Sequence, residues 1–448
     1  MRSRRWLAAF STLALTTLTA CPFTDDYYLM NDGGAAGVGG ATAGGGTAAA
    51  GGGASGACSA ANCSGACCSG VCVDLANDRS NCGRCANTCA TGRICSVGTC
   101  ASGWIPMAAP PAEFAAREKA AYTTFSDKVF VWGGLDANGN ELRTGAIYDP
   151  ALDTWKMSSV EPNTPSGREL ATAVWTGSAV LVFGGRAHGD MALKDAALYD
   201  PVANRWTKVS DNPTARVAPS AAVYSGMVVF WSGLSGSLMP LGGADRYRVS
   251  SDMWNPSPTL NGPSRLGHTA CAGVGASFFV FGGIDSTITG TDKAYRYSFS
   301  ANTWSTISRG PSARWDAFGA TDGASFYVWG GRDDEAVHGD GSRYDTQWVT
   351  LEASGAPSPR YAPLRESGWT FALEGPSFAL LGGLDSSGAF LHDGGRYLSA
   401  RDEWGRIAAW PSSEDHAYGV AASVTGELIV FGGRTGPTLS NTGERYGY

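Results

Sequence analysis

The stretch KVFVWGG, from Lys128 to Gly134, is an apolar run that ends in two glycines. Variants of it recur at intervals of about fifty residues: AVLVFGG at 179–185, MVVFWSG at 227–233, SFFVFGG at 277–283, SFYVWGG at 325–331, SFALLGG at 377–383 and ELIVFGG at 427–433. Each run has the length and composition of a buried β-strand that is closed by a turn. The chain therefore contains seven copies of one structural unit.

Each copy carries further residues in a constant order around this run. An arginine precedes most of the runs, a tyrosine follows every glycine pair, and a tryptophan follows most of the tyrosines. The tyrosines are Tyr148, Tyr199, Tyr247, Tyr297, Tyr344, Tyr397 and Tyr446. The order predicts four short strands per repeat, the second ending in Gly-Gly, the third carrying the tyrosine and the fourth the tryptophan.

A period near fifty residues with Gly-Gly, Tyr and Trp in this order resembles the kelch repeat. The resemblance covers residues 103–448 and implies an all-β fold, a seven-bladed propeller in which each repeat forms one blade. The seventh repeat has no tryptophan after Tyr446, whereas Trp104 stands unmatched before the first repeat. We therefore expect residues 103–107 to supply the fourth strand of the last blade. Six blades with a decayed extra repeat is the alternative.

The N-terminal residues have the pattern of an export signal and a tether. Residues 1–20 combine three arginines with a short apolar run, and Leu18 to Cys21 resembles a bacterial lipobox. This resemblance implies cleavage before Cys21 and a lipid on its thiol, with an ordinary secretory signal or a twin-arginine signal as alternatives. Residues 21–57 form a Gly/Ala-rich linker, of which residues 31–57 would span roughly 30 Å as a coil. We expect a lipid-anchored, extracytoplasmic protein, on the outer membrane or cell surface if the cell is Gram-negative.

Residues 58–100 are rich in cysteine. An export signal places them in an oxidising compartment, so disulfides are expected in a segment with so few apolar residues. Zinc is the alternative, because Cys82 and Cys85 have ligand spacing, but the segment has no histidine. Five disulfides are predicted, with their pairing left open. The ten cysteines are Cys58, Cys63, Cys67, Cys68, Cys72, Cys82, Cys85, Cys89, Cys95 and Cys100.

Residues that could carry out catalysis are sparse. The five histidines fall in different repeats without a metal-binding spacing, and basic residues are not clustered in a chain of net charge −7. Galactose oxidase has the same fold but needs a cross-linked Tyr–Cys pair and histidine ligands. We expect Cys271 to be a buried thiol instead. The sequence predicts no catalytic residue, cofactor, metal site or nucleic-acid partner.

In some kelch propellers the repeat arginines line the channel mouth and receive acidic ligands. The residues that match by order are Arg117, Arg168, Arg216, Arg265, Arg314 and Arg360, with Glu414 in the seventh repeat. The alternative is that each arginine bonds to a neighbouring turn. Asp195, Asp292 and Asp393 match a structural acid of the repeat.

These features predict a binding module. Its partner would be a protein or a surface glycan, its only link to the membrane would be the lipid, and it would act as a monomer. A carbohydrate-active enzyme of the sugar mutarotase or oxidase type is the alternative, because such enzymes also use kelch propellers.

Overall fold

The computed structural model describes residues 63–447, apart from the gaps at 64–65, 70, 77, 79, 90–92, 97, 102, 188–190, 238, 258, 265, 267, 285–288, 364–367, 374 and 425. The predicted signal (1–20), the linker (21–57) with Cys21, and Cys58 and Arg265 therefore lie outside the described residues. Almost all regular structure is β-strand; the one described helix is a single 3-10 turn, η1 (Val249–Ser251).

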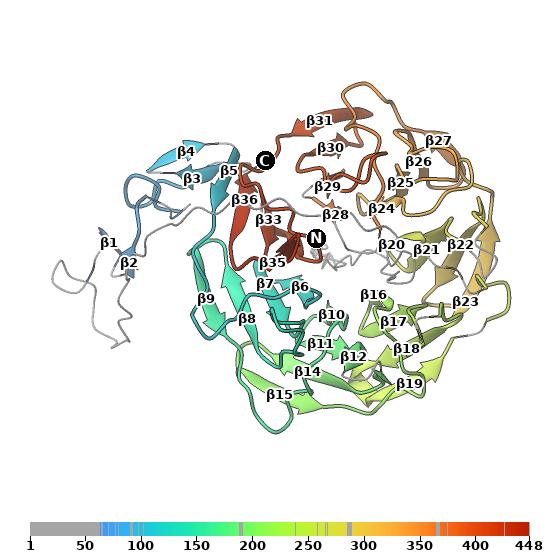
Figure 1. Cartoon of the computed structure of the whole chain (residues 1–448), viewed down its shortest axis with the longest axis horizontal. Coiled ribbons are helices and arrows are strands. Elements are labelled where there is room, and N and C mark those ends of the chain that lie inside the picture. Colours follow the sequence, from blue (N-terminus) through green and yellow to red (C-terminus); the bar gives the residue numbers. More distant parts are fainter. Residues whose placement is uncertain are drawn as a thin grey trace, which may run out of the picture.

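Seven four-stranded antiparallel sheets form a ring (Figure 1). Blade one is β6 (Ala121–Phe125), β7 (Lys128–Trp132), β8 (Gly145–Asp149) and β9 (Thr154–Met157). Blade two is β10 (Thr172–Trp175), β11 (Val180–Phe183), β14 (Ala196–Asp200) and β15 (Arg205–Lys208). Blade three is β16 (Ser220–Tyr224), β17 (Met227–Trp231), β18 (Ala244–Arg248) and β19 (Met253–Pro256). Blade four is β20 (Ala270–Val274), β21 (Ser277–Phe281), β22 (Ala294–Ser298) and β23 (Thr303–Ile307).

The later blades follow the same order. Blade five is β24 (Phe318–Thr321), β25 (Phe326–Trp329), β26 (Gly341–Tyr344) and β27 (Trp348–Thr350). Blade six is β28 (Gly368–Ala372), β29 (Ser377–Gly382), β30 (Gly394–Leu398) and β31 (Glu403–Ile407). Blade seven is β32 (Val420–Val424), β33 (Glu427–Phe431), β36 (Gly443–Gly447) and β5 (Gly103–Pro106). The first strands of neighbouring blades contact each other around the whole ring, which confirms seven blades.

Each fourth-strand tryptophan packs between two blades. Trp206 of blade two lies 5.0 Å from Tyr199 of its own blade and 5.5 Å from Trp132 of blade one, measured between ring centroids. Its Nε1–H donates to the carbonyl of Ser159 in the preceding linker, at 3.0 Å. Because a single four-stranded sheet cannot bury both of its faces, these aromatic contacts supply the core between blades.

An acidic or amide side chain joins each of several blades to the one before it. Asp153, five residues after Tyr148, accepts the tyrosine hydroxyl at 2.6 Å and the N–H of Ala108 at 2.8 Å. Asn204 makes the same two bonds in blade two, with Tyr199 and Ser159. Both Asp153 and Asn204 have positive φ, which Asp and Asn tolerate better than most residues.

The last blade is closed by the N-terminal strand, as predicted. Strand β5 pairs antiparallel with β36, so that Trp104 lies opposite Tyr446 and Pro106 opposite Glu444. The indole of Trp104 lies 5.2 Å from the Tyr446 ring and donates to Ala408 O at 2.6 Å. The chain therefore enters blade seven at the end of the strands that carries the tyrosines, opposite the end that carries Gly-Gly.

The cysteine-rich segment lies outside the ring, beside β5 (Figure 1). It contains two small hairpins, β1 (Ala66–Cys68) with β2 (Val71–Val73), and β3 (Ile94–Ser96) with β4 (Thr99–Ala101). Two further hairpins project from blades two and seven, β12 (Arg186–Ala187) with β13 (Met191–Ala192), and β34 (Arg434–Thr435) with β35 (Thr438–Leu439).

Candidate functional site

The predicted ligand arginines are buried inside their own blades. Arg168 donates from Nη1 to the carbonyl of Gly184, the first glycine of its pair, at 3.1 Å, and forms a two-point ion pair with Asp195. Arg314 repeats this with Gly330 and Asp340. Arg360 donates to the carbonyl of Gly382, to one carboxylate oxygen of Asp393 and to the backbone carbonyl of Asp393. All five that are described, Arg117, Arg168, Arg216, Arg314 and Arg360, have exposed fractions of 3% or less. These contacts give the arginines a structural role; ligand binding by them stays a prediction.

The arginine position, meaning the place in each repeat that Arg168 occupies in blade two, has no carboxylate partner in blade one. Arg117 meets Thr144 where Arg168 meets Asp195, and burial lowers the pKa of Arg117 to about 9. Asp195 and Asp393 are the structural acids that were expected. Asp292 instead pairs with the exposed Arg309.

One of the expected assignments to this position is wrong, the one in blade seven. In blades one and two, the residue two positions after the arginine has a positive φ. These residues are Lys119 and Leu170. The corresponding residue of blade four is His268, with φ of 58°, and buried Leu266 lies two residues before it; the assignment of Arg265, which lies outside the described residues, stays a prediction. In blade seven the position belongs to His416, which bonds to the first-glycine carbonyl of Gly432, and not to Glu414.

The residues with positive φ that follow the arginine position by two residues lie on the Gly-Gly face, which is the face on which each second strand ends. They form a ring around the propeller axis. Backbone N–H groups reach from one blade to the carbonyl of the one before, as from Leu170 to Lys119 and from Asp316 to His268. A Cβ on Gly184 would lie 2.4 Å from the backbone oxygen of Arg216 in the next blade, so only glycine fits there.

The partly exposed arginines of this face directly follow the glycine pairs. They are Arg186, Arg332 and Arg434, in blades two, five and seven. Each is held by a more deeply buried carboxylate. Nε of Arg332 lies 2.8 Å from Asp316, Nε of Arg434 lies 2.6 Å from Glu118 of blade one, and Nη2 of Arg186 lies 2.5 Å from Glu169.

Arg332 and Arg434 are preorganised cations. Their side chains are 36% and 38% exposed, whereas those of Asp316 and Glu118 are 0% and 5% exposed. Arg332 also stacks on Tyr361, with 4.4 Å from Cζ to the ring centroid. Burial would raise the pKa of Asp316, but His268 and Arg332 lower it below its usual value. Nε of Arg332 donates to Asp316, and Arg434 is ion-paired through Nε, so the outer nitrogens of both guanidinium groups are left for an anionic group.

An apolar patch lies on the same face as these charges, in blades two and three. Leu170, Val217, Ala218 and Leu234 form a buried cluster against which Ala192 packs. The adjoining loops carry Met191 and Met239, which are 61% and 55% exposed. Sequence reasoning missed both the patch and the arginines. The sequence signal for these arginines was an arginine directly after the glycine pair in three of the seven repeats.

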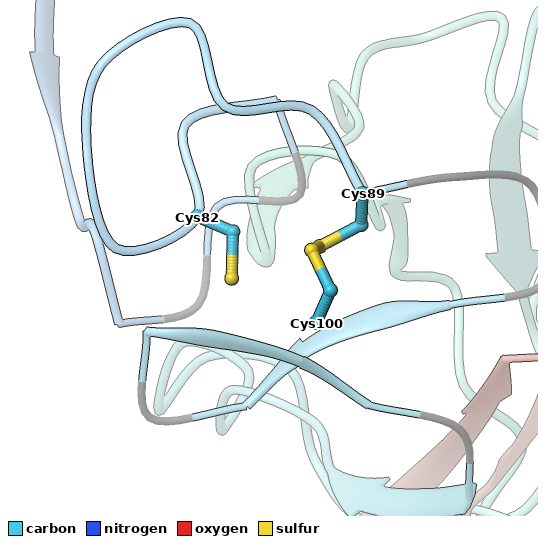
Figure 2. Close-up of side chains that lie close together, drawn as sticks. All are labelled: Cys82, Cys89 and Cys100. Carbon is cyan, nitrogen blue, oxygen red and sulfur yellow. A yellow bond between two sulfur atoms is a disulfide. The ribbon is translucent and has the colours of Figure 1, made fainter.

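Cysteines of the N-terminal segment are paired by sulfur–sulfur bonds. The described disulfides are Cys63–Cys72, Cys68–Cys85, Cys82–Cys95 and Cys89–Cys100. Cys67 is also disulfide-bonded. The sulfurs of Cys82, Cys89 and Cys100 lie within 4.8 Å of one another (Figure 2). Because they belong to two disulfides packed together, none is a thiolate that could bind zinc.

The expectation of a buried thiol at Cys271 is wrong. The residue is 2% exposed in β20, and its sulfur is disulfide-bonded. A sulfur in a disulfide is not available for the Tyr–Cys link of an oxidase.

Comparisons with known proteins identify the repeats. Residues 99–262 match the KLHDC2/KLHL20/DRC7 Kelch-repeats domain, and residues 51–103 match the Stigma-specific STIG1-like protein family. The chain is 25% identical to Beta-scruin of Limulus polyphemus over 184 residues, which is 38% of this chain and 19% of that protein. It is 26% identical to Kelch-like protein terF of Aspergillus terreus over 221 residues, 45% of this chain and 46% of that protein.

A solved structure, titled "Structure of YjhT", aligns with a TM-score of 0.49 at 15% identity, over 67% of this chain and 99% of that one. The chain spans less than half the length of either curated relative. The propeller is thus a kelch-repeat domain, a fold that typically mediates protein interactions. Within the part of the chain that the structure describes, no helix has the length and apolar character needed to span a bilayer.

Proposed function

We propose that the protein is a lipid-anchored, extracytoplasmic binding module that holds a protein partner on the Gly-Gly face of the propeller. One observation carries the proposal: preorganised guanidinium groups and exposed methionines occur together on this face. Protein interfaces are enriched in arginine and methionine, and a cation whose position is already fixed loses little entropy on binding.

The experiment compares four forms of the full chain as bait for extracytoplasmic proteins of its own cell. The parent and Arg401→Ala should retain the same protein, whereas Arg332→Ala and Arg434→Ala should each retain at least tenfold less, the equivalent of about 1.4 kcal/mol. Arg401 is a matched control, because it is 73% exposed, pairs with Glu403, and lies in the turn between β30 and β31 at the opposite end of a blade. Equal retention by all four forms contradicts the proposal. Recovery of a glycan instead would assign the face to sugar binding.

Lipid anchoring is the second part of the proposal. It rests on the sequence from Leu18 to Cys21 and is consistent with the entry of the chain into blade seven from the end opposite Gly-Gly. A tether attached there would leave the Gly-Gly face accessible. Cys21→Ser should move the protein from the detergent phase to the aqueous phase on phase separation. Unchanged partitioning contradicts the anchor.

A further inference from the structure

Blade seven has a histidine where the other described blades, apart from blade four, have a buried arginine. Nδ1 of His416 lies 2.7 Å from the carbonyl oxygen of Gly432, and Nε2 lies 2.9 Å from a carboxylate oxygen of Glu444. Arg216 makes the equivalent contacts with the carbonyl of Ser232 and with Asp245, which has the register of Glu444 in blade three. His416 is fully buried and Glu444 is 5% exposed.

Both ring nitrogens of His416 face groups that accept hydrogen bonds. A carbonyl oxygen and an ionised carboxylate have no proton to donate, and a neutral imidazole has only one N–H. The observed geometry is therefore satisfied by the doubly protonated imidazolium, which reproduces both the charge and the two bonds of the arginine. Unlike an arginine, it loses its proton near neutral pH.

The pair connects the strand that closes the ring to the rest of blade seven. Glu444 lies in β36, opposite Pro106 of β5 on one side and Val430 of β33 on the other. His416 lies just before the first strand, β32. A bond between them holds the two outer strands of the blade against the two inner ones.

We propose that His416 and Glu444 form a pH-sensitive latch on the closing blade, in which protonated His416 holds β36 and β5 in place and deprotonated His416 weakens that hold.

Other charged groups face the His416–Glu444 pair and affect the pKa values of its two members. Glu414 approaches Nε2 of His416 to 3.8 Å and is itself held by Ser440 and Thr442. His392 stacks on Trp410, bonds to Asp415, and contributes to lowering the pKa of Glu444. Burial would lower the pKa of His416, but the bonds to Glu444 and Gly432 and the charges of Glu444 and Glu414 raise it above its usual value. Burial would raise the pKa of Glu444, but His416 lowers it.

The pH dependence of the latch follows from these pKa shifts of His416 and Glu444. A histidine with a raised folded pKa contributes its full stability below its unfolded pKa of about 6.5, and loses it as the pH rises through the folded value. Glu444, with a lowered folded pKa, loses its contribution only as the pH falls through that value. The latch is closed between these limits and opens on the alkaline side. Each pKa unit gained by His416 on closure corresponds to a tenfold change in the opening equilibrium.

The test is hydrogen exchange of the full chain across about pH 5.5–8.5, corrected for intrinsic exchange rates. Protection of β5 and β36 should fall by tenfold or more as the pH rises, whereas β14 and β15 of blade two, held by Arg168 and Asp195, should not change. His416→Arg should keep β5 and β36 protected at every pH. His416→Gln should leave them poorly protected at every pH, and the control His392→Gln should retain the parent's dependence.

The latch is overturned if β5 and β36 show the same pH profile as blade two, or if the profile persists in His416→Gln. Should His416→Arg fail to fold, NMR titration of the imidazole in the parent decides independently. A folded pKa of His416 at or below about 6.5 would also overturn the proposal.

Discussion

The cysteine-rich segment and the propeller are adjacent in the chain but are stabilised in different ways. In the segment, the described buried cluster consists of Cys82, Cys89 and Cys95, with Cys100 packed against it. In the propeller, the clusters are aromatic and aliphatic side chains shared between blades. A small segment without an apolar core depends on covalent links, whereas a ring of blades depends on every blade having two neighbours. The first should therefore be sensitive to reduction, and the second to loss of the closing strand.

The largest effect is expected from deletion of residues 103–107. This deletion removes β5, exposes the edge of β36, and eliminates the contacts of Trp104 with Tyr446 and Ala408. Trp104 is partly buried, and truncation of a fully buried tryptophan costs about 3–5 kcal/mol. At about 1–2 °C per kcal/mol in a domain of this size, the melting temperature of the propeller should fall by roughly 3–10 °C. Calorimetry provides the measurement. An unchanged transition would mean that closure by the N-terminal strand contributes nothing to the ring.

Reduction should distinguish the two parts within one molecule. A disulfide typically contributes about 2–4 kcal/mol, so loss of the four described bonds should unfold residues 63–101. Hydrogen exchange after treatment with a phosphine reductant should rise to the unfolded rate in β1–β4 and stay low in the blades. Within the propeller, any change should be confined to β20, which contains Cys271. Loss of protection throughout the blades would show that the propeller also depends on disulfides.

Much of the ring could be predicted from sequence because its signals are local. An apolar run that ends in Gly-Gly encodes a strand and its turn within seven residues, and the unmatched Trp104 indicated how the ring closes. The assignment of the arginine position was wrong in blade seven because it depends on register. Glu414 lies two residues from His416, which occupies the position. Arg434 was missed because its partner, Glu118, comes from the other end of the propeller sequence.

A smaller effect is expected at the junction between blades seven and one. Asp153→Ala removes the acceptor for both Tyr148 and Ala108, and leaves a buried hydroxyl without its partner. The cost should be about 1–3 kcal/mol. Asp153→Asn is the matched control, because Asn204 makes the same two bonds in blade two, and it should stay within about 0.5 kcal/mol of the parent. Denaturant titration measures both; equal losses would assign the effect to charge instead of hydrogen bonding.

The smallest effect on the propeller is expected from removing residues 58–100 while keeping Gly103 and all that follows. The described disulfides pair cysteines within this segment, and none links it to a blade. Strand β5 keeps its ladder with β36 and the contacts of Trp104, so each blade retains both neighbours. The melting temperature of the propeller should therefore stay within about 1–2 °C of the parent, since a change of 1 kcal/mol shifts it by about that much in a domain of this size. Comparing the calorimetric transition of this deletion with that of the 103–107 deletion locates the boundary between the cysteine-rich segment and the propeller. A drop similar to that of the 103–107 deletion would mean that the segment orients β5, and that the two parts form one folding unit.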